Sequence, residues 1–486
     1  MTSPRREKIS AVDTAWLRMD RPSNLMMICG VMLFADRIRY ERVARLIEER
    51  FLKFHRFRQR PVQTLGAAYW ETVPRVDMAE HVQRISLPGR AGKRELQALV
   101  SRLAATPLDR ERPLWQFHLV ENFTGGSALI QRIHHCYADG IALVRVLMSM
   151  TDATAKGPPA MPFEPVPRTR RSDVDDPLLQ LLKPMSGAMK LARMAGSTVL
   201  EKGAAIWSDP AQAVALAEQG GALTAEVAKL ALMPQDSPTR FKGKPTGRKR
   251  VAWAEPIALD EVKVISRALA ASVNDVLLSC VAGALRAYLA GKGDPVDGVM
   301  VRALVPVNLR PVEKAYRLGN QFGLVFLDLP LGIENPVERV YAVRANMNAL
   351  KDSYQPILAL GLLAAMGTGP KVLQEQLLQA LARNGSAVMT NVPGPQQRLY
   401  FAGGAIERFL FWVPQSGDIG MGVSILSYAG HVQFGLITDA GLCPDPERII
   451  ERFGLEFEKL VLTTLMAPWP RDGELDPEIA AGAVGA

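Results

Sequence analysis

Residues 128–150 read ALIQRIHHCYADGIALVRVLMSM, and this stretch decides the fold that we expect for the chain. Residues 128–133 form a short apolar run with two polar interruptions, which predicts a buried strand that ends at two histidines. Residues 141–150 are apolar and predict a helix. Between them, Gly140 permits a tight turn. A strand that leads through a short turn into a helix indicates an α/β protein.

The two histidines carry the clearest chemical signal in the sequence. A histidine titrates near pH ~6.5, so it can take a proton from a hydroxyl group and return it to a leaving group. Neighbouring strand residues face opposite sides, so only one of His134 and His135 can point into a shared cavity. The pair therefore predicts one base and one structural partner. An isolated His-x3-Asp would equally fit a metal site or a buried polar pair, so this pattern alone leaves both interpretations open.

Four further segments accompany His-His-x3-Asp-Gly: Pro113-Leu114-Trp115, Ser272-Val273-Asn274-Asp275, Gly319-Asn320 and Thr390-Asn391-Val392-Pro393-Gly394-Pro395. By their order and spacing, the five motifs resemble those of the bacterial wax ester synthase/diacylglycerol acyltransferase family. Residues 9–13, running on to Phe34, look like the opening strand of that family. The resemblance therefore covers nearly the whole chain.

The resemblance implies two chloramphenicol acetyltransferase-like subdomains, each a mixed β-sheet flanked by helices. We expect the N-terminal subdomain over residues 1–155 and the C-terminal subdomain over residues 251–470. Residues 156–250 would form a crossover connector, because six prolines between 156 and 177 exclude helix or central strand and short helices are expected from 178 onward. Residues 471–486 are expected to be a disordered tail.

The resemblance assigns the base to His135 and leaves His134 as its structural partner. Related acyltransferases pair the aspartate at the position of Asp139 with an arginine, so we expect Asp139 to hold the loop, with Gly140 beside it. Asn274 lies at a predicted helix start, where Ser272 is a possible cap. A buried amide there could donate to a developing oxyanion or could tie down a neighbouring loop, and both interpretations stay open.

Four more residues are candidates for the wall of a substrate tunnel: Trp115, Asn391, Pro393 and Gly394. For Trp115 we prefer a simpler interpretation, since an aromatic residue in a strand-like run usually packs in the core. Asn391 and the residues after it predict a rigid turn, because two prolines flank a glycine. We expect this turn to line the acyl or cofactor tunnel rather than to take part in the chemistry.

Composition places few further limits on partners. The 58 basic and 49 acidic residues give a net charge of +9, which favours anionic partners. The densest basic cluster comprises Arg240, Lys242, Lys244, Arg248, Lys249 and Arg250. We interpret it as a solvated linker, with docking on an anionic membrane or attraction of coenzyme A phosphates as the alternatives. Nucleic acid is not expected, because no recognised nucleic-acid-binding motif is present.

The sequence indicates a cytoplasmic protein. Its four cysteines lie far apart, which argues against a zinc ribbon or a disulfide framework. The charged start is not followed by an apolar stretch with a cleavage site, so we expect no signal peptide. The longest apolar runs fall short of the roughly 18 residues of a transmembrane helix. Peripheral attachment to the inner face of the membrane or to lipid inclusions remains compatible with this.

The resemblance implies transfer of a long-chain acyl group from acyl-CoA to a fatty alcohol, to diacylglycerol, or to both. His135 would act as general base in a direct transfer, with acyl-CoA as co-substrate and no metal or prosthetic group. Three rivals stay open: a condensation or polyketide-associated acyltransferase fed by carrier proteins, a non-catalytic coat protein of lipid bodies, and acyl transfer to a small polar acceptor.

Overall fold

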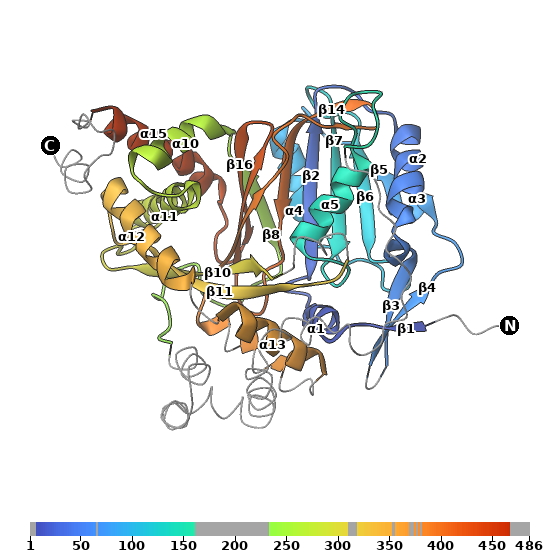
Figure 1. The fold of residues 1–486 in the computed structure, drawn as a ribbon, viewed down its shortest axis with the longest axis horizontal. Helices are drawn as coiled ribbons and strands as arrows, with labels where there is room; N and C mark the ends of the chain where they lie inside the picture. The colour runs from blue at the N-terminus through green and yellow to red at the C-terminus, as the bar shows by residue number, and fades with distance from the viewer. Residues whose placement is uncertain are drawn as a thin grey trace.

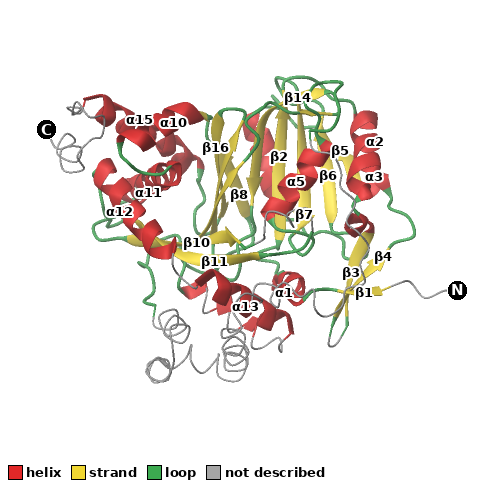
Figure 2. Cartoon of the chain, in the orientation of Figure 1, coloured by secondary structure: helices red, strands yellow, loops and turns green. Residues whose placement is uncertain are grey.

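A computed structural model describes residues 6–64, 67–160, 233–309, 318–351, 355–368, 374–375, 378–379 and 382–466. Its described strands form two large sheets, which stand side by side, and a small sheet near the N-terminus (Figure 1). Figure 2 shows helices on the outer sides of both large sheets. Both sheets combine parallel and antiparallel pairs, so the expected mixed α/β architecture is confirmed.

The first large sheet is built around two strands that are buried along their whole length. Its order is β13 (Tyr400–Phe401), β14 (Gly404–Trp412), β2 (Met27–Phe34), β7 (Ser127–His134), β6 (Trp115–Val120) and β5 (Val82–Arg84). Strands β2 and β7 pair antiparallel, and β5 runs parallel to β6. The strand expected over residues 128–133 is thus confirmed as β7.

Helices cover both faces of this sheet. Helix α5 (Gly140–Met150) crosses one face with α2 (Tyr40–Arg50) beside it, and α4 (Lys93–Ala104) lies on the other (Figure 1). The apolar side of α4 packs on the sheet and also on Val251 and Trp253 of the second sheet. The sheets therefore share a hydrophobic core.

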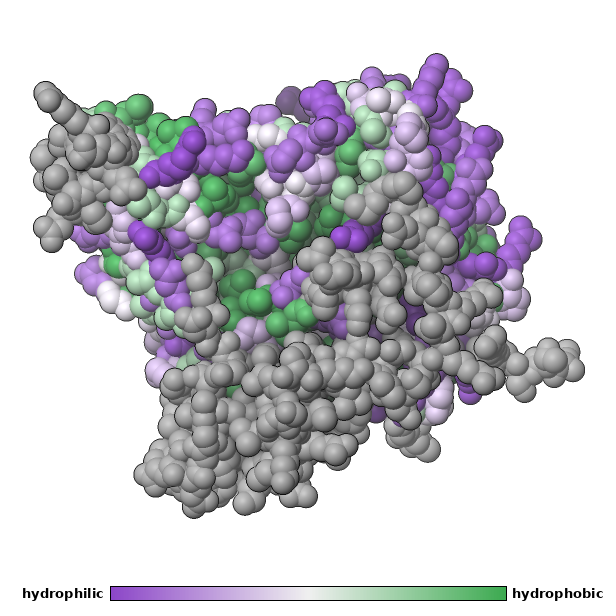
Figure 3. All heavy atoms as spheres, viewed as in Figure 1, coloured by the Kyte–Doolittle hydropathy of each residue, from purple (hydrophilic) through white to green (hydrophobic). Residues whose placement is uncertain are grey.

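A small antiparallel sheet extends the first subdomain. It consists of β1 (Arg6–Lys8), β4 (Ala68–Thr72) and β3 (Gln59–Gln63). The short helices η1 (Phe51–Lys53) and η2 (His55–Arg58) lead into β3, whereas α3 (Met78–His81) packs against β5 and β6. Hydrophilic side chains dominate the surface over α2 and α3, whereas apolar surface gathers nearer the middle of the molecule (Figure 3).

The second large sheet has the order β11 (Phe322–Pro330), β10 (Met300–Asn308), β12 (Ala387–Pro393), β15 (Met421–Tyr428), β16 (His431–Asp439) and β8 (Lys249–Trp253), and β9 (Ile257–Ala258) also pairs with β16. Four helices pack on one side of it: α10 (Leu259–Ala268), α11 (Val273–Gly291), α12 (Pro336–Lys351) and α15 (Glu447–Met466). Helix α13 (Gln355–Thr368) lies near β11 and packs against α1 (Ala11–Met19) (Figure 1).

Helix α11 begins where the sequence predicts. Ser272 accepts a hydrogen bond from the backbone N–H of Asp275, and the Asp275 side chain accepts one from Ser272, so the two form a capping box. The helix is long and apolar enough to cross a membrane, but 72% of its most apolar window is buried inside the protein. Burial on this scale is that of a core helix.

Strand β14 connects the two sheets. It comes from the C-terminal part of the chain, yet it pairs with β2 in the first sheet, with Leu410 opposite Val31. No local residue pattern predicts this exchange. The expected boundaries at 155 and 250 stay predictions, because residues 161–232 of the connector, like the tail at 471–486, lie outside the described residues.

Two local expectations are wrong. Residues 11–19 form helix α1 rather than part of an opening strand, and Ser10 caps it by accepting a hydrogen bond from the N–H of Asp13. The predicted turn at Asn391 is also corrected, because β12 stays paired with β15 as far as Pro393. The polypeptide leaves the sheet only at Gly394.

The basic cluster is solvated only in part, since Lys244, Arg248 and Arg250 are exposed. Arg240 pairs with Asp294, Lys242 with Asp236, and Arg250 with Glu447. Lys249 is buried and donates to Asn24 and Gln415, and burial lowers its pKa to about 8. These partners make the segment part of the packed structure.

Candidate active site

A cavity lies between the two large sheets, with about 850 Å³ of empty space that includes its open mouth. The first part of the chain contributes Trp16, His135, Asp139 and Gly140 to its wall. The second part contributes mainly apolar residues of β10, β11 and β12, and the end of β14. The cavity therefore has a largely apolar wall that also carries one imidazole and a few polar groups.

His135 is held on this wall by its neighbours. Its backbone N–H donates to Met26 O at 2.7 Å, and its ring stacks on Trp16 with 4.1 Å between centroids. Burial lowers the pKa of the imidazole to about 4, although the charge of Asp139 opposes the shift. The ring is therefore neutral at physiological pH, which is the form that can accept a proton.

His134 faces the opposite side of the strand, as the alternation predicts. Its Nδ1 accepts a hydrogen bond from the N–H of Cys136 at 3.1 Å, and its Nε2 lies 3.8 Å from a carboxylate oxygen of Asp20. It lines a separate small pocket with Asp20 and Arg110. These contacts suit a structural partner, and the roles of the two histidines stay predictions.

A buried amide fixes the backbone of the base. Asn320 Nδ2 lies 2.8 Å from both His135 O and Asp13 Oδ1, and the Asn320 N–H also donates to Asp13 Oδ1 at 3.0 Å. Burial raises the pKa of Asp13, while its hydrogen bonds to Asn320 oppose the shift. Helix α1 thus holds His135 in two ways. Trp16 stacks on its ring, and Asp13 binds Asn320, which in turn donates to the His135 carbonyl oxygen.

Asp139 joins the histidine loop to the second sheet. It caps α5 by accepting from the N–H of Ala142 at 2.9 Å, and its other oxygen accepts from the N–H of Gln321 at 3.0 Å. Between the same two segments, the N–H of Gly319 donates to Tyr137 O. Such contacts hold a loop, as expected for Asp139, and the arginine partner implied by the resemblance stays a prediction.

Gly140 has a different role from the one expected. Its backbone is not among the positive-φ glycines, so no tight turn requires a glycine here. A Cβ atom added to Gly140 would meet no atom within 4 Å. Gly140 also lines a second cavity of about 460 Å³, together with Val392, Phe411 and Val413, which line both. The missing side chain leaves open space where the two cavities adjoin.

The remaining predicted residues lie at different distances from the cavity. Asn391 lines it and donates from Nδ2 to Asn274 Oδ1 at 2.6 Å. Asn274 itself is exposed, so the expectation of a buried amide is wrong. Its hydrogen bond to Asn391 instead joins the start of helix α11 to strand β12. Pro393 is exposed, and the N–H of Gly394 donates to Ser427 O at 2.9 Å. Of the described residues that line the cavity, none is Pro393 or Gly394.

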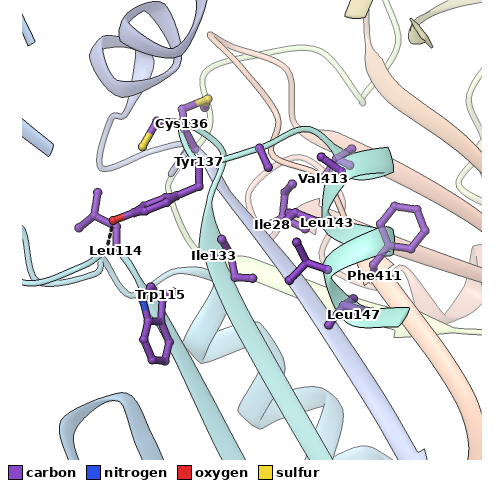
Figure 4. Close-up of a cluster of buried hydrophobic side chains, with 14 of the residues drawn as sticks. Ile28, Leu114, Trp115, Ile133, Cys136, Tyr137, Leu143, Leu147, Phe411 and Val413 are labelled. Atoms are coloured by element: carbon purple, nitrogen blue, oxygen red, sulfur yellow. Dashed lines mark hydrogen bonds between the residues drawn. The ribbon is translucent and has the colours of Figure 1, made fainter. Parts of the chain in front are cut away.

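Trp115 lies in the hydrophobic core, away from both cavities. Its indole N–H donates to Phe57 O at 2.8 Å, and its ring stacks on His81 with 4.1 Å between centroids. Figure 4 shows Trp115 near Leu114 and Tyr137, apart from the side chains on α5. The structure therefore agrees with the preferred interpretation of core packing.

Sequence reasoning missed Trp16, Asp13 and Thr390. The hydroxyl group of Thr390 is buried without a hydrogen-bond partner among the described residues, and Thr390 lines the cavity of His135. Its place at the start of the Asn-Val-Pro-Gly-Pro motif was the available signal. For Trp16 and Asp13 no local signal exists, because their partners lie more than a hundred residues away in the chain.

Two family models match the sequence. The wax ester synthase/diacylglycerol acyltransferase catalytic domain matches residues 9–277, and the C-terminal domain of the same family matches residues 318–461. A probable diacylglycerol O-acyltransferase of Mycobacterium tuberculosis is 30% identical over 407 residues, which is 81% of this chain and 84% of that protein. A putative one from the same species is 26% identical over 483 residues, covering 94% and 90%.

Solved structures share the fold. The wax ester synthase/diacylglycerol acyltransferase from Marinobacter aquaeolei VT8 matches with a TM-score of 0.66 at 22% identity, covering 94% of this chain and 99% of that one. A starter condensation domain of rhizomide synthetase matches with a TM-score of 0.54 at 13% identity, covering 98% and 95%. The expected two-subdomain, chloramphenicol acetyltransferase-like fold is thereby confirmed.

Proposed function

Because the chain belongs to the wax ester synthase/diacylglycerol acyltransferase family and is an O-acyltransferase, we propose that it moves a long-chain acyl group from acyl-CoA to a fatty alcohol or a diacylglycerol, with His135 as general base. The observation that carries the proposal is a neutral, buried imidazole on the wall of a largely apolar cavity between the two sheets. A lipid hydroxyl can reach such a base while its chain stays out of water.

The transfer is direct. An imidazole nitrogen of His135 accepts the hydroxyl proton while the alcohol oxygen bonds to the thioester carbonyl carbon. The tetrahedral intermediate then collapses, the carbon–sulfur bond breaks, and the imidazolium returns the proton to the thiolate. Neither a metal nor a prosthetic group is needed for these steps.

The oxyanion of the intermediate needs hydrogen-bond donors in the same cavity. Thr390 and Asn391 line that cavity, and Thr390 brings a buried hydroxyl group with no partner among the described residues. Asn391 is itself held by Asn274. We therefore place the oxyanion beside Thr390 and Asn391, with Asn274 as a positioning residue behind them.

We also propose a cytoplasmic enzyme that meets its lipid substrates at a membrane or lipid-body surface. The support is indirect, since both proposed acceptors dissolve poorly in water and the chain has a net charge of +9. Co-flotation of the purified protein with vesicles of neutral and anionic phospholipid tests the proposal. Absence of the protein from both floating fractions would contradict it.

Acceptor-dependent thiol release tests the function. Purified protein is given palmitoyl-CoA with hexadecanol, with 1,2-dipalmitoylglycerol, or with no acceptor, and the lipid products are identified by mass spectrometry. Release that depends on an acceptor and yields the matching ester is the expected result. Equal thiol release in all three reactions would show that the protein is a thioesterase and would contradict the proposal.

A further inference from the structure

The second cavity is an apolar chamber between helix α5 and the strands β2, β7 and β14, and it adjoins the cavity of His135. Of the twelve described residues that line it, nine carry purely hydrocarbon side chains. Two of the others are glycines, and the third is Gln131. Such a wall favours a hydrocarbon chain as ligand, because it removes apolar surface from water and offers few partners to a polar group.

Gln131 changes this character little. It lies directly opposite Gly30 in the β2–β7 pair, and a Cβ atom added to Gly30 would collide with Cγ and Nε2 of Gln131. The side chain is therefore packed over the bare backbone of Gly30, and the whole residue is only 5% exposed. Little of its amide is left to contact a ligand.

The chamber leads away from the base. On β14, Phe411 lines both cavities, whereas Phe409 lines the chamber alone. On α5, Gly140 lines both cavities, whereas Leu147 lines the chamber alone. From Gly140 to Leu147 the helix advances about 10 Å along its axis, which is enough for several methylene groups. A chain that passes Gly140 from His135 therefore runs toward Phe409 and Leu147.

Core residues close the far end. Phe409 is paired with Met32 of β2, and Met32 in turn lies opposite Leu129 of β7. Met32 is the next residue after Gly30 on the same face of the sheet. Both Met32 and Leu129 are buried in the core, and neither is among the described residues that line the chamber. Leu147 and Phe409 are therefore the deepest side chains of its described lining.

Figure 4 shows this arrangement. Ile28, Leu143 and Val413 lie together between α5 and the strands, and Leu147 lies farther along the same helix. The size of the side chain at position 147 thus decides how much of the chamber is open at its far end.

We propose that the chamber holds the hydrocarbon tail of a substrate whose reacting group lies at His135, and that Leu147 is a specificity-determining residue that sets the preferred length of this tail. The inference rests on the proposed function and adds to it the site of the chain. Acyl-CoA and the acceptor alcohol both carry such a tail, so the experiment distinguishes the two sources. A tail too long for the chamber leaves methylene groups in water, where they add nothing to binding.

The test measures kcat/KM as a function of chain length in two series. One series runs from octanoyl-CoA to stearoyl-CoA with hexadecanol fixed, and the other runs from butanol to octadecanol with palmitoyl-CoA fixed. Leu147→Phe makes the chamber shorter, and Leu147→Ala makes it longer. The matched controls are Met148→Phe and Met148→Ala, at a half-buried position on α5 that is not among the described residues lining either cavity. Circular dichroism checks the fold of each variant.

Each methylene group excluded from the chamber should cost about fourfold in kcat/KM. We therefore expect Leu147→Phe to lose about tenfold or more with the longest chains of one series and to keep wild-type values with the shortest. Leu147→Ala should move the optimum of the same series to longer chains. A shift in the acyl-CoA series assigns the chamber to the donor, and a shift in the alcohol series assigns it to the acceptor. Both Met148 variants should keep the wild-type profiles.

Two results would overturn the inference: unchanged length profiles in both folded Leu147 variants, or losses that are equal at every length in both series. Either result leaves the proposed function standing. Failure of the wild type with every pair of substrates would contradict the proposed function and the inference together.

Discussion

At the residue scale, the environment of His135 matters more than its motif. Burial between Trp16 and Phe322 removes water from the imidazole and so disfavours its charged form. The neutral form is then available at any physiological pH. An exposed histidine would be partly protonated, and so inactive as a base, near pH ~6.5.

The pH dependence of kcat/KM should report this burial. The free imidazole is active only when neutral, and its pKa is lowered to about 4, so activity should stay level from pH 8 down to about 5 and fall near pH 4. Initial rates at subsaturating palmitoyl-CoA give the profile, with circular dichroism to show that the fold persists. An acidic limb centred near pH ~6.5 would mean that the ring is exposed to water.

Asn320 should act as a positioning residue. Asn320→Ala removes the hydrogen bond to His135 O and leaves a buried carbonyl unpaired, so we expect kcat to fall about tenfold. The KM for palmitoyl-CoA should change little, because Asn320 is not among the described residues that line the cavity. Steady-state kinetics separate the two constants. A raised KM with an unchanged kcat would place Asn320 in substrate binding instead.

Part of this site could be predicted from residues alone. Strand alternation correctly put His134 and His135 on opposite sides, because that rule needs only neighbouring residues. Two contacts could not be predicted: the stacking of Trp16 on His135, and the hydrogen bonds by which Asp13 and Asn320 hold the His135 backbone. They depend on three segments meeting in space, and local sequence carries no record of that.

At the scale of elements, the strand–loop–helix unit β7–α5 was predictable and helix α1 was not. The apolar runs on either side of the histidines are long enough to identify their elements. Residues 11–19 are apolar on most sides and look like strand, but Ser10 caps them as a helix and most of that helix is buried. Burial on all sides hides the helical period on which such predictions depend.

Gly140 offers a test at this scale. Gly140→Val places its Cβ where no atom lies within 4 Å, and its side chain narrows the junction of the two cavities. We expect a folded enzyme whose rate with hexadecanol falls about tenfold or more, while a short alcohol such as butanol is less affected. Relative kcat/KM for the two alcohols is the measurement. An equal loss with both would mean that the substitution disturbs the base rather than the passage.

At the scale of the whole molecule, the two subdomains are not separable units. β14 from the second part completes the first sheet, and Lys249 is buried among Asn24 and Gln415 where the parts meet. Two halves were expected because the family resemblance implies them and the prolines of residues 156–177 indicate a connector between them. It could not predict the strand exchange, since pairing between distant strands leaves no local pattern.

Residues 1–155 should therefore fail to fold alone. Without β14, residues 29–34 of β2 would lose their partner strand and present an apolar edge, and such edges promote aggregation. Size-exclusion chromatography of the isolated fragment, beside the full chain, is the measurement. A monomeric fragment that melts cooperatively would show that β14 is dispensable to the first sheet.

The central claim is that His135 is the base for acyl transfer, and the substitution His135→Ala tests it most directly. Thiol release from palmitoyl-CoA with hexadecanol is compared among the wild type, His135→Ala and His431→Ala, a matched change at an exposed histidine. We predict a loss of about 10² to 10⁴ in kcat for His135→Ala, with its fold intact by circular dichroism, and wild-type activity for His431→Ala. A folded His135→Ala protein that keeps wild-type turnover would contradict the account.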